Sequence, residues 1–229
     1  MSSSTLPTFE SLRGSGQWVR PSVDFLRLRW YLSGPASTRI KVLSSAFSST
    51  SSPSPYQSAD DGFQPISDSP VSSPPVSSIT VTVRCLDSRS DDWDDAHHDC
   101  LPDDKTVVTL PDGTEQTTRC CGEDRPGPGP SVTVTASRQP FVTIHDYIMV
   151  VHPWLLAVEP DIRAAIRNHP LATLPATVDV YIHPAAVSPL SLQDSRSTRS
   201  AAKEGLRKQI ADTATRWAAE EAENAQGQT

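Results

Sequence analysis

The densest apolar segment of the chain, residues 141–158 (FVTIHDYIMVVHPWLLAV), has the residue pattern of a helix. Its apolar residues recur at helical spacing and share one face: Ile144, Tyr147, Ile148, Val151 and Leu155. Thr143 and Asp146 have the spacing of a capping box, in which each side chain accepts a hydrogen bond from the other residue's amide. The pattern therefore predicts a helix that starts at Thr143 and buries one apolar face.

A proline divides this segment. Pro153 disfavours the helical conformation at the preceding residue, so the sequence predicts a stop or a kink at His152. Trp154 follows and is expected to fill the core at that corner. A second helix is expected from Glu159, with Pro160 at its first helical position. The prediction is a helix–kink–helix hairpin.

Alternating apolar and polar residues predict β-strands on both sides of this hairpin. The strands are expected at residues 79–84, 105–110, 115–120, 131–136 and 178–183. Pro111-Asp112-Gly113-Thr114 is typical of a tight turn, so 105–120 is the clearest β-hairpin. An earlier alternation at 23–43 predicts another possible hairpin. The expected class is α+β, with a small, mainly antiparallel sheet packed by the helices in a core domain of residues 79–184.

The segments outside that core differ in composition. Residues 1–22 are polar and rich in serine, and residues 44–78 contain 14 serines and six prolines. Such segments bury too little apolar surface to offset chain entropy, so we expect 1–22 to be disordered and 44–78 to be a disordered, low-complexity linker. Residues 185–197 are expected to form a loop, and 198–224 a C-terminal amphipathic helix.

Charge is unevenly distributed along the 229 residues, whose net charge is −7. Residues 44–130 hold 15 acidic and five basic residues, which argues against nucleic acid as a partner. No apolar run has the length of a membrane span, so we expect no membrane partner and a cytoplasmic location. Residues 1–43, with six basic and two acidic residues, leave a mitochondrial transit sequence as the alternative.

Cysteine and histidine concentrate in the same acidic region. His98, Cys100, Cys120 and Cys121 offer the ligand types of a zinc site. Their spacing lacks the C-x-x-C unit of common zinc fingers, and adjacent cysteines in a strand point to opposite faces. We therefore expect reduced thiols and no cofactor, with zinc as the alternative. The surrounding aspartates are expected to be a solvated charge run.

A second group of candidate residues flanks the predicted helices. Tyr147, His152, Trp154 and His183 are expected to contact a ligand in a pocket or a protein partner. Catalysis is not expected from them, since no nucleophile elbow, papain-type cysteine context or phosphate-binding glycine motif accompanies them.

The segments TVVTLPDGT, TTRCCGEDRPGPGP and FVTIHDYIMVVHPWL resemble uncharacterised small proteins of filamentous ascomycete fungi, over about residues 79–168. This resemblance implies no activity, cofactor or catalytic residue. The leading hypothesis is a non-catalytic accessory protein that binds an unknown protein partner. The alternatives are a small enzyme or ligand-binding protein of a fungal biosynthetic pathway with a pocket near Trp154, and a zinc-stabilised recognition module.

Overall fold

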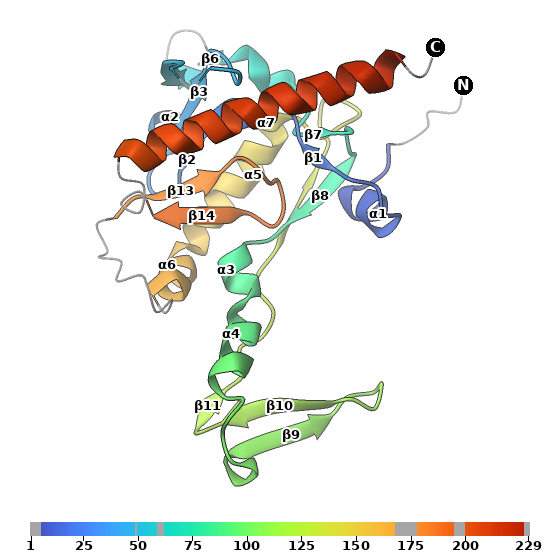
Figure 1. Cartoon of the computed structure of the whole chain (residues 1–229), viewed down its shortest axis with the longest axis vertical. Helices are drawn as coiled ribbons and strands as arrows, with labels where there is room; N and C mark the ends of the chain where they lie inside the picture. Colours follow the sequence, from blue (N-terminus) through green and yellow to red (C-terminus); the bar gives the residue numbers. More distant parts are fainter. Residues whose placement is uncertain (1–5, 49, 59–61, 168–177, 195–199, 227–229) are drawn as a thin grey trace.

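The computed structural model (Figure 1) describes residues 6–48, 50–58, 62–167, 178–194 and 200–226. It has the predicted mixed α+β class, with antiparallel sheets and a C-terminal helix. A body of helices and sheets carries an arm, formed by the middle of the chain, that projects away from it. The first five residues of the segment predicted to be disordered, and residues 195–197 of the predicted loop, lie outside the described part.

Helix α5 (Ile144–Ala157) is the central helix of the body and begins at the predicted capping box. The Thr143 hydroxyl oxygen accepts a hydrogen bond from the Asp146 amide at 3.0 Å, and the Asp146 carboxylate accepts one from the Thr143 amide at 3.0 Å. The Ser137 hydroxyl donates to the same carboxylate at 2.5 Å. Burial opposes the charge on Asp146, but these hydrogen bonds outweigh it and hold the pKa of the carboxyl below its ordinary value.

A stop or a kink was predicted at His152, and the stop does not occur, because α5 continues through Pro153 to Ala157. The proline cannot donate to the carbonyl of Met149, but both residues are exposed, so water can hydrate that carbonyl. Helix α6 (Glu159–Arg167) follows directly. Trp154 is only partly buried at this junction, so it does not fill the core as predicted.

A five-stranded antiparallel sheet forms one side of the body. Its strands, in spatial order, are β14 (Ser191–Asp194), β13 (Val180–His183), β2 (Leu28–Tyr31), β3 (Ile40–Leu43) and β4 (Pro53–Pro55). The possible hairpin at 23–43 is therefore present as β2 and β3, and it lies in the middle of the sheet. The predicted loop 185–197 contains β14, which provides backbone partners for the outer edge of β13.

The remaining elements form smaller units. The paired strands are β1 (Arg20–Pro21) with β7 (Ser72–Ser73), β5 (Gln57–Ser58) with β6 (Gly62–Phe63), and β8 (Ser78–Val81) with β12 (Val132–Thr135). Short helices link the strands: η1 (Phe25–Arg27), α2 (Ala36–Arg39) and η2 (Pro65–Asp68). The strands predicted between 79 and 184 thus belong to separate sheets, and the body includes residues that precede 79.

The segments predicted to be disordered contribute to the core where the structure describes them. Within 44–78, Phe47 and Phe63 are exposed, but four other apolar side chains are buried: Tyr56, Ile66, Val71 and Val76. Helix α1 (Phe9–Gly14) likewise buries its two large apolar side chains within the segment 1–22. Composition alone misses such segments, because a few well-spaced anchors are enough to hold a polar chain against a core.

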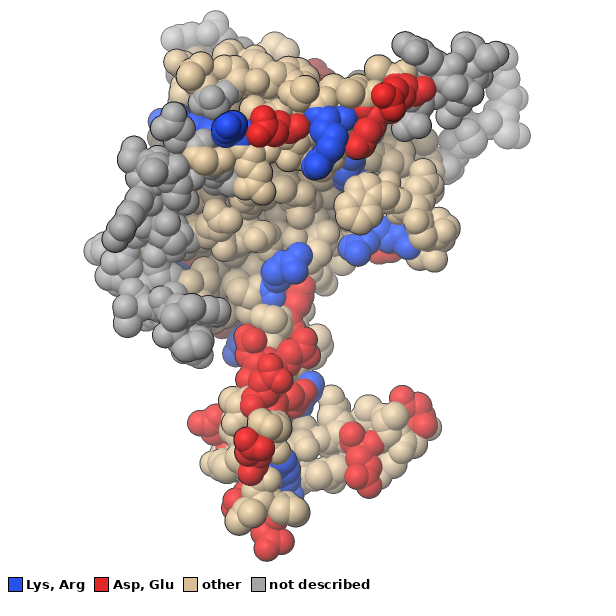
Figure 2. All heavy atoms as spheres, viewed as in Figure 1, with Lys and Arg blue, Asp and Glu red and all other residues tan. Residues whose placement is uncertain are grey.

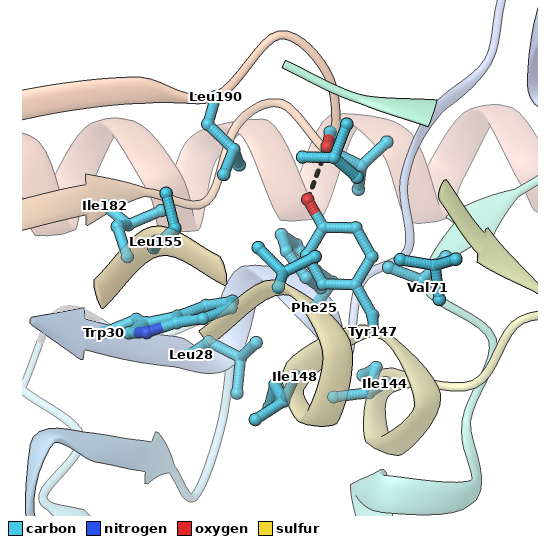
Figure 3. Close-up of a cluster of buried hydrophobic side chains, with 14 of the residues drawn as sticks. Phe25, Leu28, Trp30, Val71, Ile144, Tyr147, Ile148, Leu155, Ile182 and Leu190 are labelled. Carbon is cyan, nitrogen blue, oxygen red and sulfur yellow. Dashed lines mark hydrogen bonds between the residues drawn. The ribbon is translucent and has the colours of Figure 1, made fainter. Parts of the chain in front are cut away.

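Trp30 and Tyr147 lie at the centre of the core, where the sheet meets α5 (Figure 3). The Tyr147 ring makes edge-to-face contacts with Phe25 and Trp30, at centroid distances of 5.5 and 6.2 Å. Its hydroxyl donates a hydrogen bond to the Val187 carbonyl at 2.5 Å. The tryptophan that fills the core is therefore Trp30.

Helix α7 (Ser200–Gln226) lies across the body, as the predicted C-terminal helix (Figure 1). It buries Ile210 and Ala214 against Leu26 and Ala46 in a second, smaller apolar cluster. No helix in the described part of the chain is both long and apolar enough to cross a membrane.

Candidate functional site

An arm formed by residues 84–129 extends from the body between β8 and β12 (Figure 1). Its stem contains α3 (Arg84–Asp87) and α4 (Arg89–Ala96), and its end is a three-stranded sheet. Helix η3 (Pro102–Asp104) leads into that sheet, whose strands are β9 (Lys105–Thr109), β10 (Glu115–Cys120) and β11 (Glu123–Asp124). Because the arm projects from the body, another macromolecule can approach it from several sides.

The aspartates of the stem were expected to be a solvated charge run, and the segment that carries them is helical. Asp91 and Asp92 lie in the first turn of α4, where carboxylates interact favourably with the helix dipole. Ser88 followed by this acidic pair is a helix-start signal that could have been recognised in the sequence. The predicted hairpin at 105–120 is present as β9 and β10.

The arm carries the whole net charge of the protein. Residues 84–129 include 12 acidic and five basic residues, a net charge of −7, which leaves 15 acidic and 15 basic residues for the rest of the chain. Figure 2 shows the acidic side chains gathered along the arm. A partner that approaches the arm therefore meets a strongly negative surface on a body without net charge.

One ion pair joins α4 to the residue that follows β11, and one ring contact stabilises the end of α4 itself. Arg125 donates two hydrogen bonds to the Asp94 carboxylate, from Nε at 2.9 Å and from Nη2 at 2.6 Å. The hydrogen bonds from Arg125 lower the pKa of Asp94, so the pair is ionised at neutral pH. Trp93 is buried and stacks on His97 at a centroid distance of 4.3 Å. The ion pair fixes the stem helix against the end of the arm.

A groove of about 440 Å³ lies between α4 and the β9–β10 hairpin. It is lined by Trp93, Asp94, His97, His98, Lys105, Leu110, residues 114–117 and Arg125. The buried indole N–H of Trp93 has no hydrogen-bond acceptor among the described residues.

Strand β9 is an edge of the arm's sheet, whose order is β11-β10-β9. Val107 and Val108 in this strand have 47% and 41% of their surface exposed. Exposed edge strands are templates for pairing with another chain, and proteins usually protect them with charges or bulges. The only charged residue within β9 is Lys105 at its first position. The middle of this edge is therefore available to a partner strand.

Three of the four candidate metal ligands converge in the arm. The Sγ atoms of Cys100, Cys120 and Cys121 all lie within 4.8 Å of one another, and all three thiols are free. The Cys100–Cys121 distance is 3.4 Å, and the Cys120–Cys121 distance is 3.7 Å. His98 is not part of this cluster: its Nε2 lies 2.9 Å from a carboxylate oxygen of Asp99, and its side chain is 71% exposed.

Cys120 and Cys121 were expected to point to opposite faces of a strand, but they do not, because the strand ends between them. Cys120 is the last residue of β10 and pairs with Glu123. Cys121 and Gly122 form the two-residue turn, with φ angles of 51° and 83°. Positive φ at both positions is typical of a type I′ hairpin, and it brings the Cys121 thiol beside its neighbour. Sequence patterns based on strand alternation cannot reveal this proximity.

The pKa values of the two adjacent thiols in the cluster are raised. Hydrogen bonds with Cys100 and Cys120 raise the pKa of Cys121 to about 12. Burial and a hydrogen bond with Cys100 raise the pKa of Cys120. Cys85, in α3, lies outside the cluster, and burial raises its pKa to about 11.

Three of the four residues expected to contact a ligand or a partner, Tyr147, His152 and His183, take part in the packing and hydrogen bonding of the body. Tyr147 is fully buried and its hydroxyl is bonded to the body. The Nδ1 atom of His152 accepts a hydrogen bond from Trp30 at 2.9 Å, and its Nε2 donates to the Gly34 carbonyl at 2.9 Å. His183 is half-buried in β13, where its Nδ1 accepts from the Ala185 amide. Burial lowers the pKa of both histidines, so they are neutral groups of the fold.

The fold and the arm together define an α+β protein that presents an acidic, thiol-containing arm. Comparisons with protein-family models, with curated proteins and with solved structures gave no match.

Proposed function

We propose that the protein is a non-catalytic interaction protein, and that its arm binds a basic, extended segment of a protein partner. The observation that carries this proposal is the concentration of the entire net charge of −7 on a projecting arm, residues 84–129. Complementary charge accelerates encounter and selects partners. The same charge repels the phosphates of nucleic acids and the arm of a second copy of this chain.

The edge of β9 supports an extended conformation for the bound segment. A peptide that adds a strand to an exposed edge gains main-chain hydrogen bonds, while alternate side chains provide specificity. Val107 and Val108 offer apolar contacts at the middle of this edge. Exposed carboxylates flank it, from Asp103 and Asp104 at one end and from Glu115 opposite Thr109 at the other. The complementary segment has apolar residues in its centre and lysine or arginine at both ends.

The alternative of an enzyme or ligand-binding protein with a pocket near Trp154 has less support. Both ring nitrogens of His152 are used by core hydrogen bonds, and the Tyr147 hydroxyl is bonded to Val187. A catalytic or ligand-binding role would require these bonds to break in the bound state. A zinc-stabilised form of the recognition module is the second candidate, which the convergence of three thiols favours.

Fluorescence anisotropy tests the proposal with a labelled peptide whose central valines are flanked by lysines. A peptide of the same length with glutamate in place of lysine is the control. We expect the lysine peptide to bind the full-length protein and its affinity to fall with increasing salt, since exposed charges are screened. Equal binding of the two peptides, or no binding of either, would contradict the proposal.

Two matched triple variants locate the contact. Asp103→Asn, Asp104→Asn and Glu115→Gln remove three exposed charges beside β9. At about 0.5 kcal/mol for each exposed charge, their combined loss weakens peptide binding about tenfold at low salt.

The control variant combines Asp68→Asn, Asp161→Asn and Asp212→Asn, three exposed acids of the body. It changes the net charge of the protein by the same amount. We expect it to bind the lysine peptide almost as tightly as the wild type. If both triple variants lost affinity equally, binding would follow the overall charge of the molecule, and the assignment to the arm would be wrong.

A further inference from the structure

We infer that Cys100, Cys120 and Cys121 bind a thiophilic divalent cation, zinc, as three thiolate ligands. This inference stands on the thiol cluster alone and does not depend on the peptide-binding proposal. Three thiols from two segments of the arm converge without forming a disulfide. Neither the charge distribution nor the edge strand explains why they meet.

The spacing of the sulfur atoms suits a tetrahedral ion. Zinc binds cysteine sulfur at about 2.3 Å, and tetrahedral angles then separate two sulfur ligands by about 3.8 Å. The Sγ–Sγ distances of Cys121 are 3.4 Å to Cys100 and 3.7 Å to Cys120. Small side-chain rotations are enough to surround an ion. Thiolate ligands favour zinc over magnesium or calcium, which take oxygen ligands.

The turn between β10 and β11 supports a role for the cluster beyond packing. Cys121 is the only non-glycine residue with positive φ among the described residues. This backbone region is unfavourable for residues with a side chain, and such residues concentrate at functional sites. The conformation places an exposed thiol beside the fully buried Cys120. A hydrophobic contact would not require a cysteine at this exposed position.

Binding replaces three S–H bonds by three zinc–sulfur bonds, releases up to three protons to solvent and transfers no electron. Zinc takes four ligands, so one position remains for water. The ion would tie the segment after α4, which contains Cys100, to the turn after β10. This tie complements the Asp94–Arg125 pair, which joins α4 to the segment that follows β11. Zinc therefore stabilises the arm, since its binding energy is available only in the folded arrangement.

Cobalt(II) provides the direct probe, because thiolate ligation gives sulfur-to-cobalt charge-transfer absorption that oxygen ligands do not give. The full-length protein is kept reduced, titrated with cobalt(II) and then with zinc, and the affinities are taken from the absorption. We expect one equivalent of cobalt to produce the charge-transfer band, and zinc to displace it. Absence of the band in the reduced protein would overturn the inference.

Matched variants identify the ligands. Cys100→Ser and Cys121→Ser should each reduce metal affinity by more than about 100-fold, which exceeds the loss of about 10–100-fold expected for an indirect partner of a ligand. Neither thiol is fully buried, so both variants are expected to fold, which circular dichroism checks. Cys85→Ser and His98→Gln are the controls and should bind like the wild type. An equal loss in either control would overturn the three-thiolate assignment.

Discussion

The buried hydrogen bonds of His152 give a stability prediction that can be worked out from the structure. The ring lies in the core, 4% exposed, between Trp30 and the carbonyl of Gly34. Because the Gly34 carbonyl can only accept, Nε2 carries the proton and Nδ1 is free to accept from the indole N–H. His152→Leu keeps an apolar side chain at this position but removes both hydrogen bonds. The indole N–H then remains buried without an acceptor, and the partly buried Gly34 carbonyl loses its donor.

The unsatisfied buried indole N–H costs about 1–3 kcal/mol, and the hydrogen bond lost by the partly buried carbonyl adds about 1 kcal/mol. We therefore expect His152→Leu to lower the free energy of unfolding by about 2–4 kcal/mol at pH 7.5. Lowering the pH should reduce the difference in unfolding free energy between the wild type and His152→Leu. Burial holds the pKa of His152 below its ordinary value, about 6.5, so below that pH the unfolded state takes up a proton that the folded state does not. The stability that neutral His152 contributes is complete above pH 6.5 and is lost as the pH falls toward the folded-state pKa.

Urea denaturation at pH 7.5 and at pH 5.5 measures the effect. The wild type should lose up to about 1.4 kcal/mol more than His152→Leu between these two values, because only the wild type carries this titrating group. His98→Gln, at an exposed site, is the control and should change stability at pH 7.5 by less than about 0.5 kcal/mol. A constant difference between the wild type and His152→Leu at both pH values would refute the buried, neutral histidine.

Three further predictions concern the body, and chemical denaturation followed by circular dichroism measures each. Trp30→Ala should lower the free energy of unfolding by about 3–5 kcal/mol, and Trp154→Ala by clearly less, since of the two only Trp30 is fully buried. A larger loss for Trp154→Ala than for Trp30→Ala would contradict the assigned core. Tyr56→Ala should cost about 3–5 kcal/mol, whereas Phe47→Ala at an exposed site should cost less than about 1 kcal/mol; equal small effects would mean that the segment is an undocked linker. Asp146→Ala should lower the free energy of unfolding by about 1–3 kcal/mol at pH 7. This loss should become smaller below about pH 4, because protonation of the wild-type carboxylate removes the stability that its ionised form contributes. A loss that did not depend on pH would contradict the ionised cap.

Local signals were enough to predict several elements. The start of α5 depends on Thr143 and Asp146, which are three residues apart and exchange hydrogen bonds with each other's amides. The hairpin of β9 and β10 follows from strand alternation around one turn, and α7 from helix propensity. In each case, the interactions that form the element lie within a few residues of sequence, so a single chain segment contains the information.

The thiol cluster was predicted only in part, because the backbone conformation at one residue decides whether the thiols meet. Cys100, Cys120 and Cys121 were recognised as candidate ligands, but strand alternation appeared to separate the last two. The positive φ angle of Cys121 ends that alternation. No composition or spacing rule could supply this angle, because it depends on how β10 pairs with β11 and where the turn between them falls.

The core and the arm were decided by contacts between distant segments. Trp30 and His152 are 122 residues apart, and each obtains its hydrogen-bond partner only when β2 packs against α5. Trp154 has the same side chain as Trp30 and lies in the most apolar segment, yet it remains partly exposed because no distant strand covers it completely. The Ser/Pro-rich segment is ordered where Tyr56 and Val71 meet such a surface. Sequence determines which side chains prefer to be buried, whereas burial itself requires a partner surface that only the tertiary structure provides.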